Sequence, residues 1–185
     1  MLHIYFNIWG LSDSLAIRNN ILKPYLSIAC FLSNFSPNVE INWVGDFYNV
    51  MSIVRGKFWG LNDEKIQDLT VSATVNIPNQ VMDRMMAAES VKDVIEELST
   101  TRYKDLIPET EDEVEAIAEF EHAFEMAYYK SINGAFSKMF SFSTVVGISK
   151  LIGYEVRNIG SIAFGVEQKI PVETTMSKLI IKEAE

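Results

Sequence analysis

The sequence contains few of the residues from which catalytic and metal sites are usually built. It has one cysteine, Cys30, and two histidines among 185 residues. A single cysteine excludes an internal disulfide, which fits a reducing compartment, and we interpret Cys30 as a small buried hydrophobe because its neighbours are apolar. A glycine-rich phosphate loop is also missing. Gly56-Lys57 lacks the upstream glycine and the downstream serine or threonine of that motif.

The two histidines do not form a recognisable metal site. Glu119 and His122 have the Glu-x-x-His spacing of di-metal helical bundles. Such sites need a second motif of the same kind, and His3 offers none. No serine or cysteine lies in a known nucleophile motif, and the carboxylates are too numerous for one acid–base pair to be singled out. We therefore expect a protein that is not an enzyme and has neither a cofactor nor a metal ion.

Positive charge is scarce as well. The chain has 16 Lys and Arg against 25 Asp and Glu, which gives a net charge of −9. An acidic chain repels nucleic-acid phosphates and gains nothing from an anionic membrane surface, so we expect neither nucleic-acid nor direct lipid binding. The N-terminus lacks signal-peptide features. The best apolar run, residues 25–32, is far shorter than the ~20 residues of a membrane span, so we expect a soluble chain.

The pattern that is present is helical. Hydrophobic residues make up 48% of the sequence, enough for a core, and their spacing favours an all-α fold. We expect extended linkers at residues 38–44 and 70–77, and a long helix with an acidic, solvated first half. The expected helices begin at Asp46, at Val91 with Ser90 as its cap, at about Asp112 after a Thr110–Glu113 capping box, at Ser143 with an end at Gly153, at Tyr154, and near Pro171.

The sequence also contains a weak internal repeat. When the chain is shifted by 109 residues, residues 46–69 align with residues 155–178. The same shift places the long helix on residues 3–27, so the first copy lacks its opening segment. We predict about one and two-thirds helical pseudo-repeats, a truncated one over residues 1–85 and a second over residues 86–185. The identical pairs are Asn49 with Asn158, Ser52 with Ser161, Ile53 with Ile162, Gly56 with Gly165 and Glu64 with Glu173.

The second copy of this pattern resembles a known family. The segment from Tyr154 to Gly165, followed by Ile170-Pro171-Val172-Glu173, is similar to the closing signature of the C subunits of archaeal-type and V-type rotary ATPases, known as the d subunits in eukaryotes. That signature reads Glu-x-Arg-Asn-apolar-x-x-Ile-x-x-Gly, then an apolar residue, often proline, and a glutamate. Looser similarity occurs at residues 46–61, 88–103 and 119–136, and the resemblance covers about residues 40–181.

The resemblance implies a funnel of helical repeats on the cytoplasmic side of a proton- or sodium-translocating ATPase. There the family links the membrane rotor ring to the central-shaft subunits and holds no nucleotide. We take Asn49, Arg55, Glu155, Arg157 and Asn158 as candidate contacts with these partners. An alternative of equal weight is a purely structural role, in which the two asparagines cap helices and Glu155 pairs with a neighbour.

Two further interpretations stay open. The chain is either a shortened or partial member of this family, whose members carry three pseudo-repeats and have roughly twice this length, or an unrelated helical-repeat adaptor that binds a protein on its acidic helix. An enzyme would instead show a deep pocket with converging polar groups. Residues 1–40 are rich in large apolar side chains, so we expect the isolated chain to self-associate or to be poorly soluble.

Overall fold

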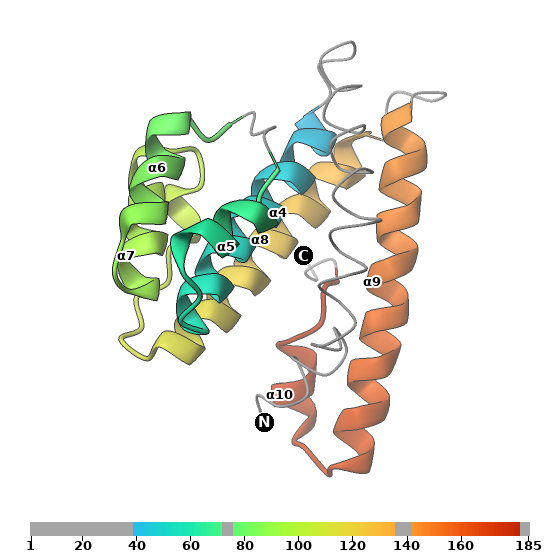
Figure 1. Ribbon diagram of the computed structural model, residues 1–185. Helices are drawn as coiled ribbons and strands as arrows, with labels where there is room; N and C mark the ends of the chain where they lie inside the picture. The colour runs from blue at the N-terminus through green and yellow to red at the C-terminus, as the bar shows by residue number, and fades with distance from the viewer. Residues whose placement is uncertain (1–38, 72–75, 136–141, 182–185) are drawn as a thin grey trace.

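The computed structural model describes residues 39–71, 76–135 and 142–181, and all regular structure in these ranges is helical (Figure 1). The expected all-α class is therefore confirmed. The helices are α4 (Val39–Phe58), α5 (Asp63–Leu69), α6 (Asn79–Ala87), α7 (Val91–Glu96), α8 (Glu113–Ala135), α9 (Phe142–Glu167) and α10 (Val172–Met176), with the 3₁₀ turns η2 (Glu97–Thr100) and η3 (Lys104–Leu106) after α7.

Two of the long helices, α4 and α9, both pack against the third, α8. The short α5 follows α4 and contacts it, just as α10 follows α9 and contacts that helix. Helix α7 packs against both α4 and α8, and α6 packs against α7 and α5 (Figure 1). Helix α4 is thus surrounded by other helices, whereas α9 lies at the edge of the described structure.

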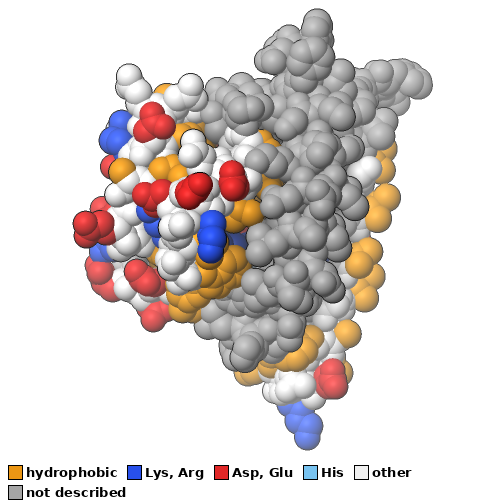
Figure 2. All heavy atoms as spheres, in the orientation of Figure 1, with side chains coloured by type: hydrophobic (Ala, Val, Ile, Leu, Met, Phe, Trp, Pro, Cys, Tyr) orange, Lys and Arg blue, Asp and Glu red, His pale blue; other side chains and the backbone are white. Residues whose placement is uncertain are grey.

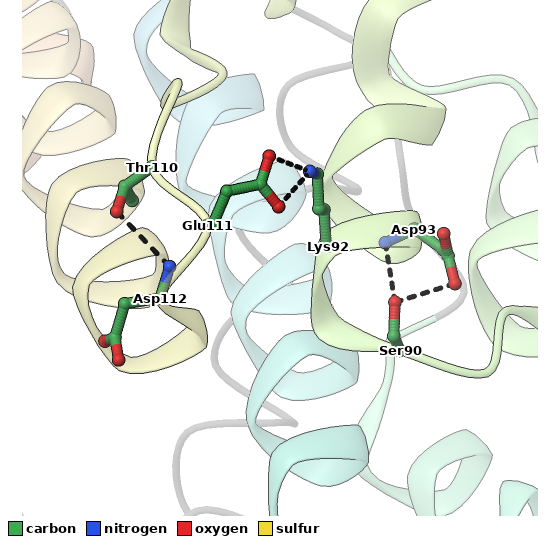
Figure 3. Close-up of polar contacts among 6 residues, drawn as sticks. All are labelled: Ser90, Lys92, Asp93, Thr110, Glu111 and Asp112. Carbon is green, nitrogen blue, oxygen red and sulfur yellow. Dashed lines mark hydrogen bonds and ion pairs between the residues drawn. The ribbon is translucent and has the colours of Figure 1, made fainter.

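The helix starts follow local hydrogen bonding. Ser90 caps α7 as expected, because its hydroxyl accepts the Asp93 N–H at 3.1 Å (Figure 3). The capping box predicted from Thr110 and Glu113 is wrong. The carboxylate of Asp112 accepts the N–H of Glu115 at 2.8 Å, and Thr110 accepts the N–H of Asp112 one step earlier. An aspartate next to the first helical residue displaced the more distant threonine as the cap.

Three other predicted boundaries need correction. Helix α4 begins at Val39 and not at Asp46, so it includes residues 39–44, which we expected to be extended. Helix α9 is continuous through Gly153, where we expected one helix to end and another to begin. A single exposed helical glycine costs only about 1 kcal/mol relative to alanine, which packing along 26 residues outweighs. The linker at Thr70 is extended as expected, but residues 72–75 lie outside the described ranges.

The core is centred on aromatic rings that α4, α8 and the segment after η2 bring together. Trp43 meets Phe124 edge-on with centroids 5.2 Å apart, and Tyr103 lies 4.7 Å from the same ring. The expected stripe of α8 is confirmed, because Ile117, Phe120, Phe124, Tyr128 and Ile132 are buried and Val114 and Ala127 partly so. This core draws residues from both sides of position 85. Most of the apolar segment 1–40, with His3 and Cys30, lies outside the described residues.

Candidate functional site

The two asparagines that the repeat pairs with each other make the same contacts. The Asn49 amide donates to the carbonyl of Val71 and accepts its N–H, both at 2.8 Å. The Asn158 amide does the same with Ile180, at 2.8 and 3.0 Å. Each asparagine is buried and binds a segment 22 residues further along the chain. Each one thus ties a long helix to the backbone that follows the next short helix.

The turns that follow the two helices also match. Leu61 donates its N–H to the carbonyl of Gly56, and Ile170 donates to Gly165, both at 2.9 Å. The residue before each donor has a positive φ, 65° at Gly60 and 54° at its counterpart, a lysine at position 169. A left-handed residue that ends a helix lets the chain fold back and satisfies free carbonyl groups. Both turns therefore direct a short helix back along the long one.

Glycine is needed at the crossing of each helix pair. A Cβ atom on Gly56 would lie 2.7 Å from Cγ1 of Ile66, and one on Gly165 would lie 2.6 Å from Oγ1 of Thr175. Ile66 and Thr175 are themselves 109 residues apart. The glycine contact, the turn and the buried asparagine amide thus recur at the same shift, so α4–α5 and α9–α10 share these three local features.

Two ion pairs connect α8 to the helices on its two sides. Arg55 of α4 binds Glu121 at 2.8 Å, and Arg157 of α9 binds Glu125. All four side chains are at least three-quarters buried. Because the two glutamates are one helical turn apart, α8 bridges α4 and α9 through adjacent carboxylates. The expectation of a solvated acidic face therefore holds for Glu119, which is exposed, but is wrong for these two.

A cationic side chain lies beside the second ion pair. Lys150 is packed over the rings of Tyr154 and Tyr128, with its Nζ 5.4 and 6.0 Å from their centroids. Burial lowers the pKa of Lys150, and the nearby Glu125 acts in the opposite direction. Burial also raises the pKa of Tyr154, whose hydroxyl is enclosed. These groups hold α9 on α8 through charge and ring contacts.

The predicted contact residues divide into interior and surface positions. Asn49 and Asn158 are buried, with their amides bound to backbone far along the chain, so neither caps its own helix. Arg55 and Arg157 reach inward to α8. Glu155 alone among the five is exposed.

Sequence reasoning missed the partners of these residues. Glu121 and Glu125 stood in a run of acidic residues that offered no way to distinguish them. Asp46 is fully buried and accepts hydrogen bonds from the Tyr103 hydroxyl at 2.6 Å and the Asn76 amide at 2.8 Å. For Asp46, the sequence offered one indication of its importance, which was its alignment with Glu155 in the repeat.

Removing the charge of Glu125 is expected to destabilise the protein. Glu125→Gln leaves Arg157 without its anionic partner in a mostly buried position, which should cost about 1–3 kcal/mol. Urea unfolding followed by circular dichroism measures the change. Glu119→Gln on the exposed face of the same helix is the control and should change little. Equal effects of the two substitutions would contradict the buried ion pair.

His122 should make stability fall in mild acid. Burial lowers its pKa below the ordinary 6.5, and Lys178 and Arg157 add to the effect. The unfolded chain then binds a proton at a higher pH than the folded one, so stability decreases as the pH falls below about 6.5. We expect His122→Gln to reduce the loss of unfolding free energy between about pH 7 and pH 5. An unchanged pH dependence in that variant would assign the loss to other groups.

A third ion pair, between Lys92 and Glu111, lies at the surface. Lys92 binds both carboxylate oxygens of Glu111 at 2.7 Å, across the gap between α7 and the start of α8 (Figure 3). That hydrogen bond raises the pKa of Lys92. Both groups are well exposed, so we assign the pair little stability.

The described ranges contain no group of three His, Cys, Asp or Glu side chains that could hold a metal ion. No helix in those ranges is long and apolar enough to cross a membrane.

Comparison with curated proteins and with solved structures gives no match. Comparison with family models gives one over residues 41–178, most of the chain, and its description is ATP synthase (C/AC39) subunit. The chain belongs to this family of rotary ATPase subunits.

Proposed function

We propose that this protein is a non-catalytic linker in the central stalk of a rotary ATPase or ATP synthase, where it couples the membrane rotor ring to the central shaft. The family match over residues 41–178 is the observation that carries the proposal. The coupled ion is a proton or sodium. The protein would then reside on the cytoplasmic side, attached to the membrane through the complex and not through lipid.

The internal contacts support a mechanical role. Torque can pass through a linker only if its helices do not slide past one another. Buried amide clamps at Asn49 and Asn158 fix the ends of the two helix pairs, and the α8 carboxylates tie α4 to α9. Such buried polar contacts have one good geometry and resist small displacements.

We assign different roles to the five candidate contact residues. Glu155 is exposed and is our candidate for direct contact with the ring or the shaft. Asn49, Arg55, Arg157 and Asn158 act as positioning residues that hold the surfaces around them. The alternative of an adaptor unrelated to rotary ATPases finds no support in the family match, and we do not retain it.

Co-expression with rotor-ring and central-shaft subunits from the same genome tests this function. Detergent extraction and affinity purification should recover the chain in stoichiometric amount. Glu155→Arg should reduce recovery without reducing thermal stability, because its side chain is exposed. Glu167→Arg, an exposed acidic site at the end of the same helix, is the matched control. Absence of recovery from a chain that circular dichroism shows to be folded would contradict the proposal.

A further inference from the structure

The two sides of α9 differ in their chemistry. Hydrophobic side chains line the right-hand edge of the molecule over this helix (Figure 2). Large aliphatic residues of α9, such as Ile152, Val156 and Ile159, are 60–66% exposed. The side toward α8 instead carries two cations, Arg157 and Lys150, which contact α8 through an ion pair and a ring contact. The inner side therefore places charge where solvent is partly excluded.

Lys150 is a cation for which the described residues provide no counter-ion. Among those residues it forms neither a hydrogen bond nor an ion pair, and its Nζ lies over tyrosine rings. The two carboxylates that act on its pKa are engaged elsewhere. Arg157 binds Glu125, and Arg55 binds Glu121. These five side chains therefore comprise three cations and two carboxylates, which leaves a surplus of positive charge.

This surplus charge is partly withdrawn from water. Burial is the largest influence on the pKa of Lys150 and lowers it, and the guanidinium of Arg157 lowers it as well. The carboxylate of Glu125 opposes these effects, but it is already bound to Arg157. An ion that is removed from water is unfavourable unless an opposite charge or hydrogen bonds compensate it. The site therefore favours a further negative charge beside the amine.

The Tyr154 hydroxyl is a second hydrogen-bond donor close to this amine. Lys150 precedes Tyr154 by about one helical turn, and its Nζ lies 5.4 Å from the centroid of the tyrosine ring. The tyrosine is 3% exposed, and its enclosed hydroxyl has no hydrogen-bond partner in the part of the chain that the structure describes. Burial raises the pKa of this hydroxyl, which therefore keeps its proton at neutral pH. The ammonium group and the phenolic O–H can both donate to an anion.

We propose that Lys150 and Tyr154 bind a small monovalent anion of the size of chloride where α9 packs on α8. One negative charge balances the surplus of the contact, whereas a phosphate or sulfate dianion would reverse it. The enclosure of the Tyr154 hydroxyl favours a compact ion over a bulky one. The bound ion strengthens the attachment of α9 to α8. The site depends on these side chains and not on whether the chain joins a rotary ATPase.

Thermal unfolding of the full chain in potassium chloride and in potassium gluconate, at equal ionic strength, tests the proposal. We expect chloride to raise the unfolding midpoint by about 2–4 °C and the rise to saturate, because a ligand that binds the folded state stabilises it. Lys150→Met keeps an apolar stem over the rings and should abolish the rise. Lys104→Met, at an exposed lysine of η3, is the matched control and should preserve it. The proposal is overturned if the rise survives Lys150→Met or if chloride gives the native chain no saturable rise.

Two further measurements separate anion binding from a purely structural role of the lysine. In gluconate, we expect Lys150→Met to unfold at a temperature no lower than the native chain, because it removes an uncompensated charge. An equal loss of the midpoint in both salts would show that the ring contacts alone explain the lysine. Tyr154→Phe removes only the O–H and should raise the chloride concentration that gives half of the rise by about tenfold. If Lys150→Met fails to fold by circular dichroism, an unchanged concentration in Tyr154→Phe overturns the proposal.

Discussion

Replacement of Asn49 by alanine is expected to lower the free energy of unfolding by about 2–4 kcal/mol. The substitution removes two hydrogen bonds and leaves the buried N–H and C=O of Val71 without their partner. An unsatisfied buried polar group costs about 1–3 kcal/mol, so the loss exceeds the ~1 kcal/mol expected of a helix cap. Urea denaturation measures it directly. Asn158→Ala should act in the same direction, because its amide binds Ile180 in the same way.

The matched control is Asn62→Ala. Asn62 caps α5 at the surface by accepting the N–H of Lys65 at 3.1 Å. Its loss should cost about 1 kcal/mol or less. If Asn49→Ala were no worse than Asn62→Ala, the amide clamp would not carry the stability that its burial implies.

The second large effect is expected at Gly56. Alanine there places a methyl group 2.7 Å from Cγ1 of Ile66, a side chain that is fully buried and cannot move into solvent. Overpacking of this kind costs about 1–3 kcal/mol, which exceeds the gain in helix propensity over glycine. Thermal unfolding measures the loss. Ile66→Ala in the same chain should weaken the penalty of Gly56→Ala, because the two substitutions act on one contact.

Gly160→Ala is expected to have the opposite effect on stability from Gly56→Ala. Nothing lies within 4 Å of a Cβ atom at this position, which is exposed in the middle of α9. Alanine should therefore stabilise the protein by about 0.5–1 kcal/mol. A stabilising Gly56→Ala, or a destabilising Gly160→Ala of similar size, would contradict the helix crossing described above.

The all-α class and the stripe of α8 could be predicted because both depend on local periodicity. The start of α7 followed in the same way from Ser90. The break expected at Gly153 was wrong because local propensity at an exposed site is weaker than packing along a long helix. The start of α4 was missed since residues 39–44 show only weak alternation by themselves.

The candidate site could be predicted only in part. The repeat indicated that Asn49 and Asn158 matter, but not that they bind backbone 22 residues away. Long-range partners leave no periodic trace in one sequence. For the same reason, the apolar side of α9 gave no sign that it is exposed while that of α4 is covered. Burial depends on which other helix is present and not on the helix alone.

Electron cryomicroscopy of the purified rotary complex would show where the chain lies. We predict density for α4–α10 between the membrane ring and the lower end of the central shaft, with Glu155 at an interface with the ring or the shaft. Density for this chain on a peripheral stalk, or a complete ring and shaft that meet without it, would contradict the proposed role as a central-stalk linker.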